Sequence, residues 1–228
     1  MEIIENKALL LRTRDPGKYG IIPKSRVVEQ HEDGSASVAV YWGLEEAKVL
    51  RNLGVKDVPS PINASYNWPG LYKPFAHQKV TSSFLTMHRR SFCFNEQGTG
   101  KTGSVIWASD YLLSKGVIKL VLVICPLSIM ESAWRNELFR LAMHRRVDVA
   151  YGKPEKRKEI IAGDAEYVII NYDGVEIVAS DILKGKFDLI VIDEANAYKN
   201  PSTRRWKVLS NLIKPNTWLW MLTGTPAS

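Results

Sequence analysis

The sequence is poor in cysteine and contains no long apolar run, internal repeat or low-complexity stretch. Its two cysteines, Cys93 and Cys125, each lie in an apolar strand-like run, which favours buried thiols over disulfides or a metal site. No run approaches the roughly 20 apolar residues of a transmembrane helix. Residues 1–15 begin with acidic Glu2 and Glu5 and alternate, unlike a signal peptide, which begins with basic residues before an apolar run. These absences predict a cytoplasmic protein with no membrane partner.

Apolar and basic residues are well represented in the chain of 228 residues. Hydrophobic residues make up 45%, enough for one packed domain and a small additional module. The net charge of +7 and the pI of about 9.3 suit a polyanionic partner such as nucleic acid. Many proteins carry such a surplus without that partner, so charge alone leaves the matter open.

The first part of the chain differs in pattern from the rest. Residues 3–12 and 36–42 alternate as strands do, and residues 44–53 form an amphipathic helical pattern. We therefore predict a small β-rich accessory domain over residues 1–60, followed by a Pro-, Asn- and Ser-rich linker over 61–74. Its basic residues are compatible with DNA binding or with a purely structural brace; they are Arg12, Arg14, Lys18, Lys24 and Arg26.

From residue 75 onward, helical stretches alternate with short and almost wholly apolar segments. Six such segments are predicted strands: residues 91–95, 120–125, 147–151, 167–171, 189–192 and 218–222. Continuous apolar strands separated by helices indicate an α/β fold with a parallel sheet covered on both faces. Such sheets bind ligands at the carboxyl ends of their strands, so we predict the site there.

A glycine-rich loop follows the first of these strands and precedes a helix. It contains Gly98, Thr99, Gly100, Lys101 and Thr102. Glycines let backbone N–H groups turn onto phosphate oxygens, and the start of the helix adds its positive dipole end. Lys101 can reach the β- and γ-phosphates, and the Thr102 hydroxyl can bind Mg²⁺. A chance glycine-rich turn is the competing interpretation, and the flanking strand and helix disfavour it.

Two carboxylates end a later apolar strand. Asp193 and Glu194 follow residues 189–192 directly. An Asp-Glu pair alone is usually a solvated turn, but downstream of a phosphate loop it predicts chemistry. Asp193 can hold the water shell of Mg²⁺, and Glu194 can position and deprotonate the water that attacks the γ-phosphate.

These motifs, together with Thr-Gly-Thr-Pro at residues 223–226, resemble those of DEAD/DEAH-type helicases and translocases of superfamily two. The resemblance covers residues 75–228 and leans toward the Swi/Snf-like or phage-type branch. It implies a RecA-like P-loop domain that uses ATP and Mg²⁺ and acts on DNA, with RNA not excluded. Two residues depart from the usual pattern, Asn95 at the first loop position and Asn196 after the acidic pair. Thr223 and Thr225 would couple the ATP site to the nucleic acid.

The same resemblance implies further site residues. Gln78 would read the adenine edge, although it can equally cap a helix. Pro126 and Ser128, with Trp134 following, resemble a motif that grips a backbone phosphate, and the alternative is a strand end and helix cap. Asn171 and Tyr172 resemble the next such motif.

For two further groups of residues we prefer a structural role to a functional one. Four basic residues are expected on a solvated helix face rather than on phosphates; they are Lys153, Lys156, Arg157 and Lys158. Three tryptophans are expected in the core rather than stacked on bases; they are Trp206, Trp218 and Trp220.

The resemblance also implies a second RecA-like domain that supplies arginine fingers. The sequence contains only the first, so we expect a fragment with low intrinsic turnover, or a partner chain, in a bacterial or phage-infected cell. Another P-loop NTPase or kinase is a competing function. So is a nucleic-acid-binding regulatory module with a weak or vestigial nucleotide site. The intact Lys101, Thr102, Asp193 and Glu194 argue against the latter.

Overall fold

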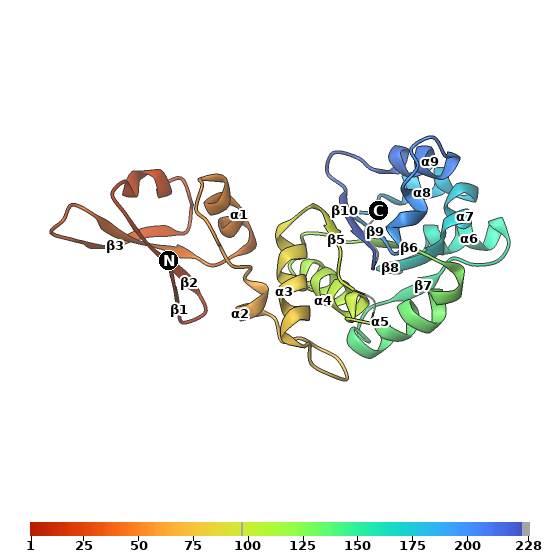
Figure 1. The fold of residues 1–228 in the computed structure, drawn as a ribbon, viewed down its shortest axis with the longest axis horizontal. Helices are drawn as coiled ribbons and strands as arrows, with labels where there is room; N and C mark the ends of the chain where they lie inside the picture. The colour runs from red at the N-terminus through yellow and green to blue at the C-terminus, as the bar shows by residue number, and fades with distance from the viewer. Residues whose placement is uncertain (97, 225–228) are drawn as a thin grey trace. The chain divides into compact units, whose positions relative to one another are not determined.

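The chain divides into two compact units in a computed structural model, residues 1–67 and 68–228 (Figure 1). The structure describes residues 1–96 and 98–224. The boundary between the units falls within the segment 61–74, which the sequence predicts as a linker. This segment also contains a short helix, α2 (Ile62–Ser65), whose Ile62 is fully buried.

The N-terminal unit is built on a four-stranded antiparallel sheet in the order β1-β2-β4-β3. Its strands are β1 (Glu2–Ile4), β2 (Ala8–Thr13), β3 (Ser25–Gln30) and β4 (Ala36–Tyr41). The alternating run over residues 3–12 is two strands rather than one, because Glu5 and Asn6 turn the chain with positive φ angles of 48° and 54°. The remaining elements are η1 (Pro16–Tyr19) and the predicted helix, α1 (Leu44–Asn52).

The second unit contains a six-stranded parallel sheet in the order β5-β10-β9-β6-β8-β7. Its strands are β5 (Arg90–Cys93), β6 (Val121–Cys125), β7 (Val147–Val149), β8 (Tyr167–Asn171), β9 (Leu189–Ile192) and β10 (Trp218–Leu222). All six predicted strands are present, with ends that differ from prediction by at most two residues. The α/β class is therefore confirmed.

Helices cover both faces of this sheet. They are α3 (Ala76–Met87), α4 (Lys101–Ser114), α5 (Asn136–Leu141), α6 (Pro154–Ala162), α7 (Tyr172–Ile177), α8 (Ala179–Gly185) and α9 (Arg204–Leu212). Shorter turns are η2 (Leu127–Ile129), the π-helical η3 (Met130–Arg135) and η4 (Ala195–Tyr198).

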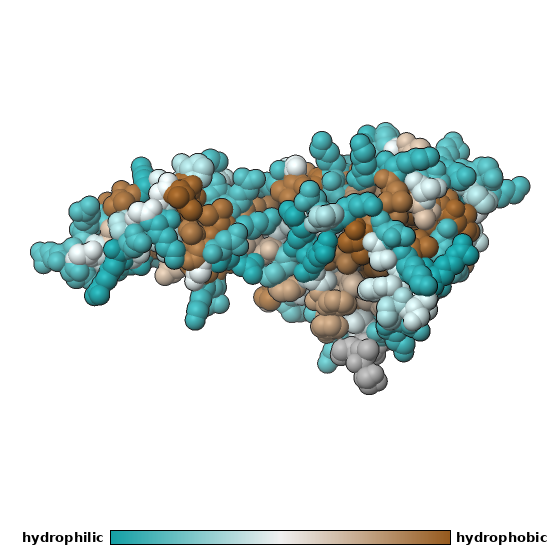
Figure 2. Space-filling view, turned by 90° about the horizontal axis from the view of Figure 1, so that it is seen from above, coloured by the Kyte–Doolittle hydropathy of each residue, from teal (hydrophilic) through white to brown (hydrophobic). Residues whose placement is uncertain are grey.

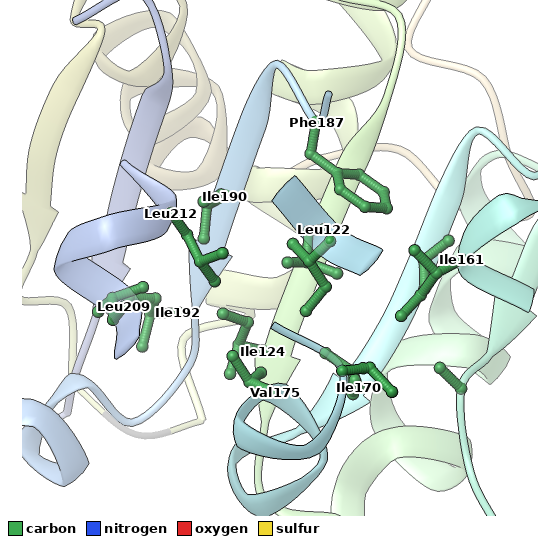
Figure 3. Packing of buried hydrophobic residues seen from close by; sticks show 14 of the residues in the cluster. Leu122, Ile124, Ile161, Ile170, Val175, Phe187, Ile190, Ile192, Leu209 and Leu212 are labelled. Atoms are coloured by element: carbon green, nitrogen blue, oxygen red, sulfur yellow. The ribbon is translucent and has the colours of Figure 1, made fainter. Parts of the chain in front are cut away.

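The sheet residues divide between the two faces as the strand period of two requires. Leu122, Ile124 and Ile170 point to one face and join a core with residues of α6 to α9 (Figure 3). Tyr167 points to the other face, where its hydroxyl hydrogen-bonds Ser109 of α4 at 2.8 Å. Because both faces are buried, β6, β8 and β9 consist of apolar runs without alternation.

Trp218 and Trp220 are buried in β10, as predicted, and Trp206 of α9 packs partly buried against the core. Cys93 and Cys125 are free and buried, also as predicted. Hydrophilic side chains cover much of the visible surface, with patches of hydrophobic ones between them (Figure 2). In the described part of the chain, no helix is both long and apolar enough to cross a membrane.

Candidate functional site

The predicted site residues come together because the six strands are parallel. All strands end at the same edge of the sheet, and β10 lies between β5 and β9. Cys93 of β5 pairs with Leu222, and Met221 pairs with Ile192 of β9. The glycine-rich loop, the Asp-Glu pair and the start of Thr-Gly-Thr-Pro therefore follow three adjacent strands.

The glycine-rich loop enters α4 through two left-handed glycines, Gly98 with a φ of 78° and Gly100 with a φ of 71°. This backbone favours glycine. The Lys101 ammonium donates to the carbonyl oxygens of Asn95 at 2.8 Å and Glu96 at 2.9 Å. The Thr99 hydroxyl donates to the Glu96 carbonyl at 2.8 Å. The lysine is thus held over the loop by neutral carbonyls. A bound phosphate would compete with these carbonyls for the ammonium.

The N-terminus of α3 braces this loop. Gln78 is buried; its Oε1 accepts from the Phe75 N–H at 2.9 Å and its Nε2 donates to the Gly100 carbonyl at 3.2 Å. His77 Nε2 lies 3.0 Å from the Thr99 carbonyl oxygen. Gln78 therefore makes the capping contact that the sequence left as its alternative role, while its adenine role stays a prediction. The contact of His77 was not predicted, although its place beside Gln78 was a signal.

An open pocket of about 930 Å³ adjoins the loop. It lies between α3, the end of β5 and the phosphate loop, and its aromatic lining residues are Tyr72, Phe75, His77 and Phe94. The Phe75 and His77 rings stack, with centroids 5.8 Å apart and planes 10° apart. A mainly apolar pocket with a few polar groups is typical of small-molecule sites.

The Asp193 carboxylate is buried and held at both oxygens. Trp134 Nε1 donates to one oxygen at 2.8 Å and the Glu194 N–H donates to the other at 3.0 Å. Burial raises the pKa of Asp193, while these hydrogen bonds and the charge of Lys101 oppose that shift. Glu194 has a left-handed φ of 53°, a strained conformation of the kind found at functional sites.

The donor set fits Mg²⁺. Asp193 supplies a carboxylate and Thr102 a hydroxyl, both oxygen ligands. The described residues contain no cluster of three or more His, Cys, Asp or Glu that could bind a metal. Mg²⁺ commonly binds through one or two protein groups plus phosphates and water, so a sparse donor set suits it.

Of the residues predicted to contact nucleic acid, some are accessible to solvent and others are already hydrogen-bonded within the chain. Ser128 is exposed and Pro126 half-buried, at the start of η2. Asn171 is buried and accepts from Arg157 Nη1 at 3.0 Å. The Tyr172 hydroxyl donates to the Asp193 carbonyl oxygen. The side chains of Asn171 and Tyr172 therefore already have protein partners.

One member of the basic cluster contradicts the prediction of a solvated helix face. Arg157 is buried and also donates to the carbonyls of Ala150 at 2.6 Å and Gly152 at 2.9 Å. Burial is possible because these three acceptors take hydrogen bonds from its Nε and Nη1. The other three, Lys153, Lys156 and Lys158, are exposed as predicted.

Of the two predicted coupling residues, Thr223 directly follows strand β10. It is buried, and its N–H donates to the Cys93 carbonyl at 3.1 Å, which ties the end of β10 to β5. Thr225 lies outside the described residues.

This parallel sheet, with a glycine-rich phosphate loop and an Asp-Glu pair at its carboxyl edge, defines a RecA-like P-loop domain. A model of the SNF2-related domain family matches residues 38–228. The chain therefore belongs to the SNF2-related family and is an N-terminal motor domain of the Swi/Snf type within superfamily two.

Individual relatives agree with this assignment. The chain is 31% identical over 190 residues to Helicase SWR1 of Saccharomyces cerevisiae, which covers 79% of this chain and 12% of that protein. It is 26% identical over 160 residues to the uncharacterized ATP-dependent helicase YqhH of Bacillus subtilis, covering 68% and 27%. The solved Sulfolobus solfataricus SWI2/SNF2 ATPase core in complex with dsDNA superposes with a TM-score of 0.62 and 27% identity, covering 70% and 33%.

The aligned part of this chain spans 12% to 14% of the length of the first fungal relatives. Neither of the two relatives named above is a phage protein, so they lend no support to the predicted phage-type branch or phage-infected host.

Proposed function

We propose that this domain binds Mg-ATP at the carboxyl edge of its parallel sheet and is the ATP-binding half of a DNA helicase or translocase. The observation that carries the proposal is the convergence of Lys101, Thr102 and Asp193 at that edge, with a pocket of about 930 Å³ beside them. Regulatory modules with a vestigial site would not be expected to retain all three groups.

The residues of the phosphate loop would each bind part of the nucleotide. The backbone N–H groups of Gly98 to Gly100 and the start of α4 would cradle the phosphates. The Lys101 ammonium would exchange its carbonyl partners for the β- and γ-phosphate oxygens. Its present acceptors are neutral carbonyl oxygens, whereas phosphate oxygens carry negative charge and attract the ammonium more strongly, which favours the exchange.

Hydrolysis would use the acidic pair. Thr102 would bind Mg²⁺ directly and Asp193 would hold water molecules of its shell, so that the ion neutralises charge on the phosphates. Glu194 would orient the attacking water and accept its proton. The adenine would lie in the pocket beside Gln78, whose amide uses one donor and one acceptor for Gly100 and Phe75 and keeps further capacity for a base edge.

The proposed nucleic-acid partner is duplex DNA. The similar solved structure is described as a complex with dsDNA. In this chain, Pro126 and Ser128 lie at the same edge of the sheet as the phosphate loop, where Ser128 is exposed. The second RecA-like domain stays a predicted partner that would close the site and supply arginine side chains to the transition state.

The first test is Mg-ATP binding by calorimetry for the wild type, Lys101→Ala and Lys119→Ala, with and without duplex DNA. Lys119 is an exposed control at the opposite edge of the sheet, next to the start of β6. We expect Lys101→Ala to weaken binding about tenfold or more, because a charge-assisted hydrogen bond contributes roughly 1.5–3 kcal/mol. Lys119→Ala should bind like the wild type. If the wild type and both variants bind Mg-ATP equally, or if none of them binds it, the assignment of the phosphate loop is wrong.

A further inference from the structure

Trp134 makes an unusual contact for a core tryptophan. Its side chain is fully buried, and its indole N–H donates to the Asp193 carboxylate at 2.8 Å. Buried indoles need an acceptor, but a backbone carbonyl suffices. Trp107 and Trp220, both fully buried, donate to the carbonyls of Pro69 and His88, each at 3.0 Å. Burial alone therefore does not explain why Trp134 meets a carboxylate.

The contact fixes the orientation of Asp193. With Trp134 on one oxygen and the Glu194 N–H on the other, the carboxylate plane cannot rotate without losing a hydrogen bond. A carboxylate accepts at about four lone-pair positions. Two such bonds therefore leave positions for the water shell of a metal ion. Groups that hold a metal-site residue in this way are part of the working geometry of the site.

Trp134 reaches Asp193 from a segment 59 residues earlier in the chain. It lies in the π-helical η3, directly after η2, and π-helical turns are frequent at functional sites. The Ser132 hydroxyl donates to the Ser128 carbonyl at 3.1 Å, which links the two turns. The segment that carries exposed Ser128 thus also carries the indole that holds Asp193.

We propose that Trp134 is a positioning residue that orients the Asp193 carboxylate toward Mg²⁺ bound with the nucleotide. The inference rests on the proposed function of the site. It also provides a physical connection between the segment proposed to meet a DNA phosphate and the acidic pair, because a shift of η3 would move the indole and with it the carboxylate.

The test compares Trp134→Phe with Trp220→Phe in the full chain. Each substitution removes one indole N–H and the same volume from a fully buried site, but only Trp134 contacts Asp193. Binding of ATP is measured by calorimetry with Mg²⁺ and with EDTA, and unfolding is measured by denaturant. We expect Trp134→Phe to weaken Mg-ATP binding about tenfold, within the range for removal of a supporting group at a metal site. Binding in EDTA should be unchanged, and Trp220→Phe should keep the full effect of Mg²⁺.

The possible outcomes separate a positioning role of Trp134 from a purely structural one. If Trp134→Phe keeps the effect of Mg²⁺, or if both variants lose it equally, Trp134 is only a core residue. If ATP binding by the wild type does not depend on Mg²⁺, the proposed function itself is wrong. Should Trp134→Phe not fold, the indole ¹H–¹⁵N resonance of Trp134 in the wild type replaces it. That resonance should shift when Mg²⁺ is added to the nucleotide-bound chain, and an unmoved resonance overturns the proposal.

Discussion

Gly100 illustrates how one residue meets two constraints at the phosphate loop. Its φ of 71° favours glycine, and a Cβ atom there would overlap the Gln78 amide. Gly116, after the end of α4, has a similar φ of 68°, but a Cβ there would meet nothing within 4 Å. The pair separates the backbone requirement from the requirement for space.

We therefore expect Gly100→Ala and Gly116→Ala to share one effect and differ in another. Gly116→Ala should lower the free energy of unfolding by about 1 kcal/mol, the cost of a left-handed alanine, and Gly100→Ala by at least that amount. Only Gly100→Ala should also weaken Mg-ATP binding, because the Gln78 amide must leave the Gly100 carbonyl and the loop shifts with it. Denaturant unfolding and calorimetry measure the two effects. Equal nucleotide binding by both variants would show that the brace from α3 does not matter for binding.

At the scale of elements, a buried ion-pair network connects α4 to the segment before β7. Arg145 donates to Asp110 of α4 at 2.6 Å and to Glu166, just before β8, at 2.7 Å. The Asp110 side chain is only 2% exposed. Neighbouring Arg146 instead pairs with Asp164 at 3.3 Å, where both side chains are well exposed. Of two adjacent arginines, one thus joins the buried network and the other forms a surface pair.

Replacing each arginine by methionine should give very different losses of stability. We expect Arg145→Met to lower the free energy of unfolding by about 3 kcal/mol, because the buried Asp110 carboxylate loses its arginine and keeps the ring of His144 at 2.9 Å. For Arg146→Met we expect less than about 1 kcal/mol, as for other exposed pairs. Chemical denaturation of both variants checks this. Similar losses would mean that the network does not hold α4 to the sheet edge.

The central strands of the parallel sheet were predictable because burial on both faces leaves an unbroken apolar run. The residues of β6, β8 and β9 are all buried, so length and composition marked them. The strand β3 was not predicted, because five of its six residues are exposed and it shows no alternation. Its position depends on pairing with β4, which local sequence does not encode.

The positions of the glycine-rich loop and the acidic pair at the carboxyl edge of the sheet were likewise predictable, because each is continuous in sequence and follows a strand. Contacts between distant segments were not. Arg157 looks like one of four exposed cations, yet it is buried on carbonyls and on Asn171. The bond from Trp134 to Asp193 joins residues that no local pattern relates. Such contacts depend on how the helices pack, which the spacing of residues does not specify.

Over the whole molecule, the surplus of positive charge lies on one unit. Residues 1–67 contain nine Lys or Arg and nine Asp or Glu, so they are formally neutral. Residues 68–228 contain 22 and 15, which accounts for the entire net charge of +7. Affinity for DNA backbone follows the number of phosphates neutralised. This distribution favours the RecA-like unit as the main surface for the proposed DNA partner.

Both units nevertheless carry a local group of exposed cations, which allows a matched test. Lys153, Lys156 and Lys158 are exposed at α6, whose Arg157 contacts Asn171 at the carboxyl edge of the sheet. In the N-terminal unit, a hollow on the sheet is lined by Lys7, Lys24 and Arg26, and the Lys24 ammonium lies 4.6 Å from the Tyr41 ring centroid. Converting each group to alanine removes the same charge.

The sequence alone favours a solvated helix face for the three lysines, but α6 lies beside the carboxyl edge of the sheet through the contact of Arg157 with Asn171. We therefore expect the triple alanine variant at α6 to weaken duplex DNA binding more than the one in the N-terminal unit. The negative slope of log K against log salt should become shallower by about 0.9 for each DNA phosphate that the variant no longer neutralises. At α6 the change should therefore be up to about 3. Fluorescence anisotropy over a salt series measures affinity and slope together. A larger loss from the N-terminal triple would assign that sheet a DNA-binding role. Unchanged binding there, with a loss at α6, would leave the N-terminal sheet as a structural brace, since its charge then contributes nothing to holding the duplex.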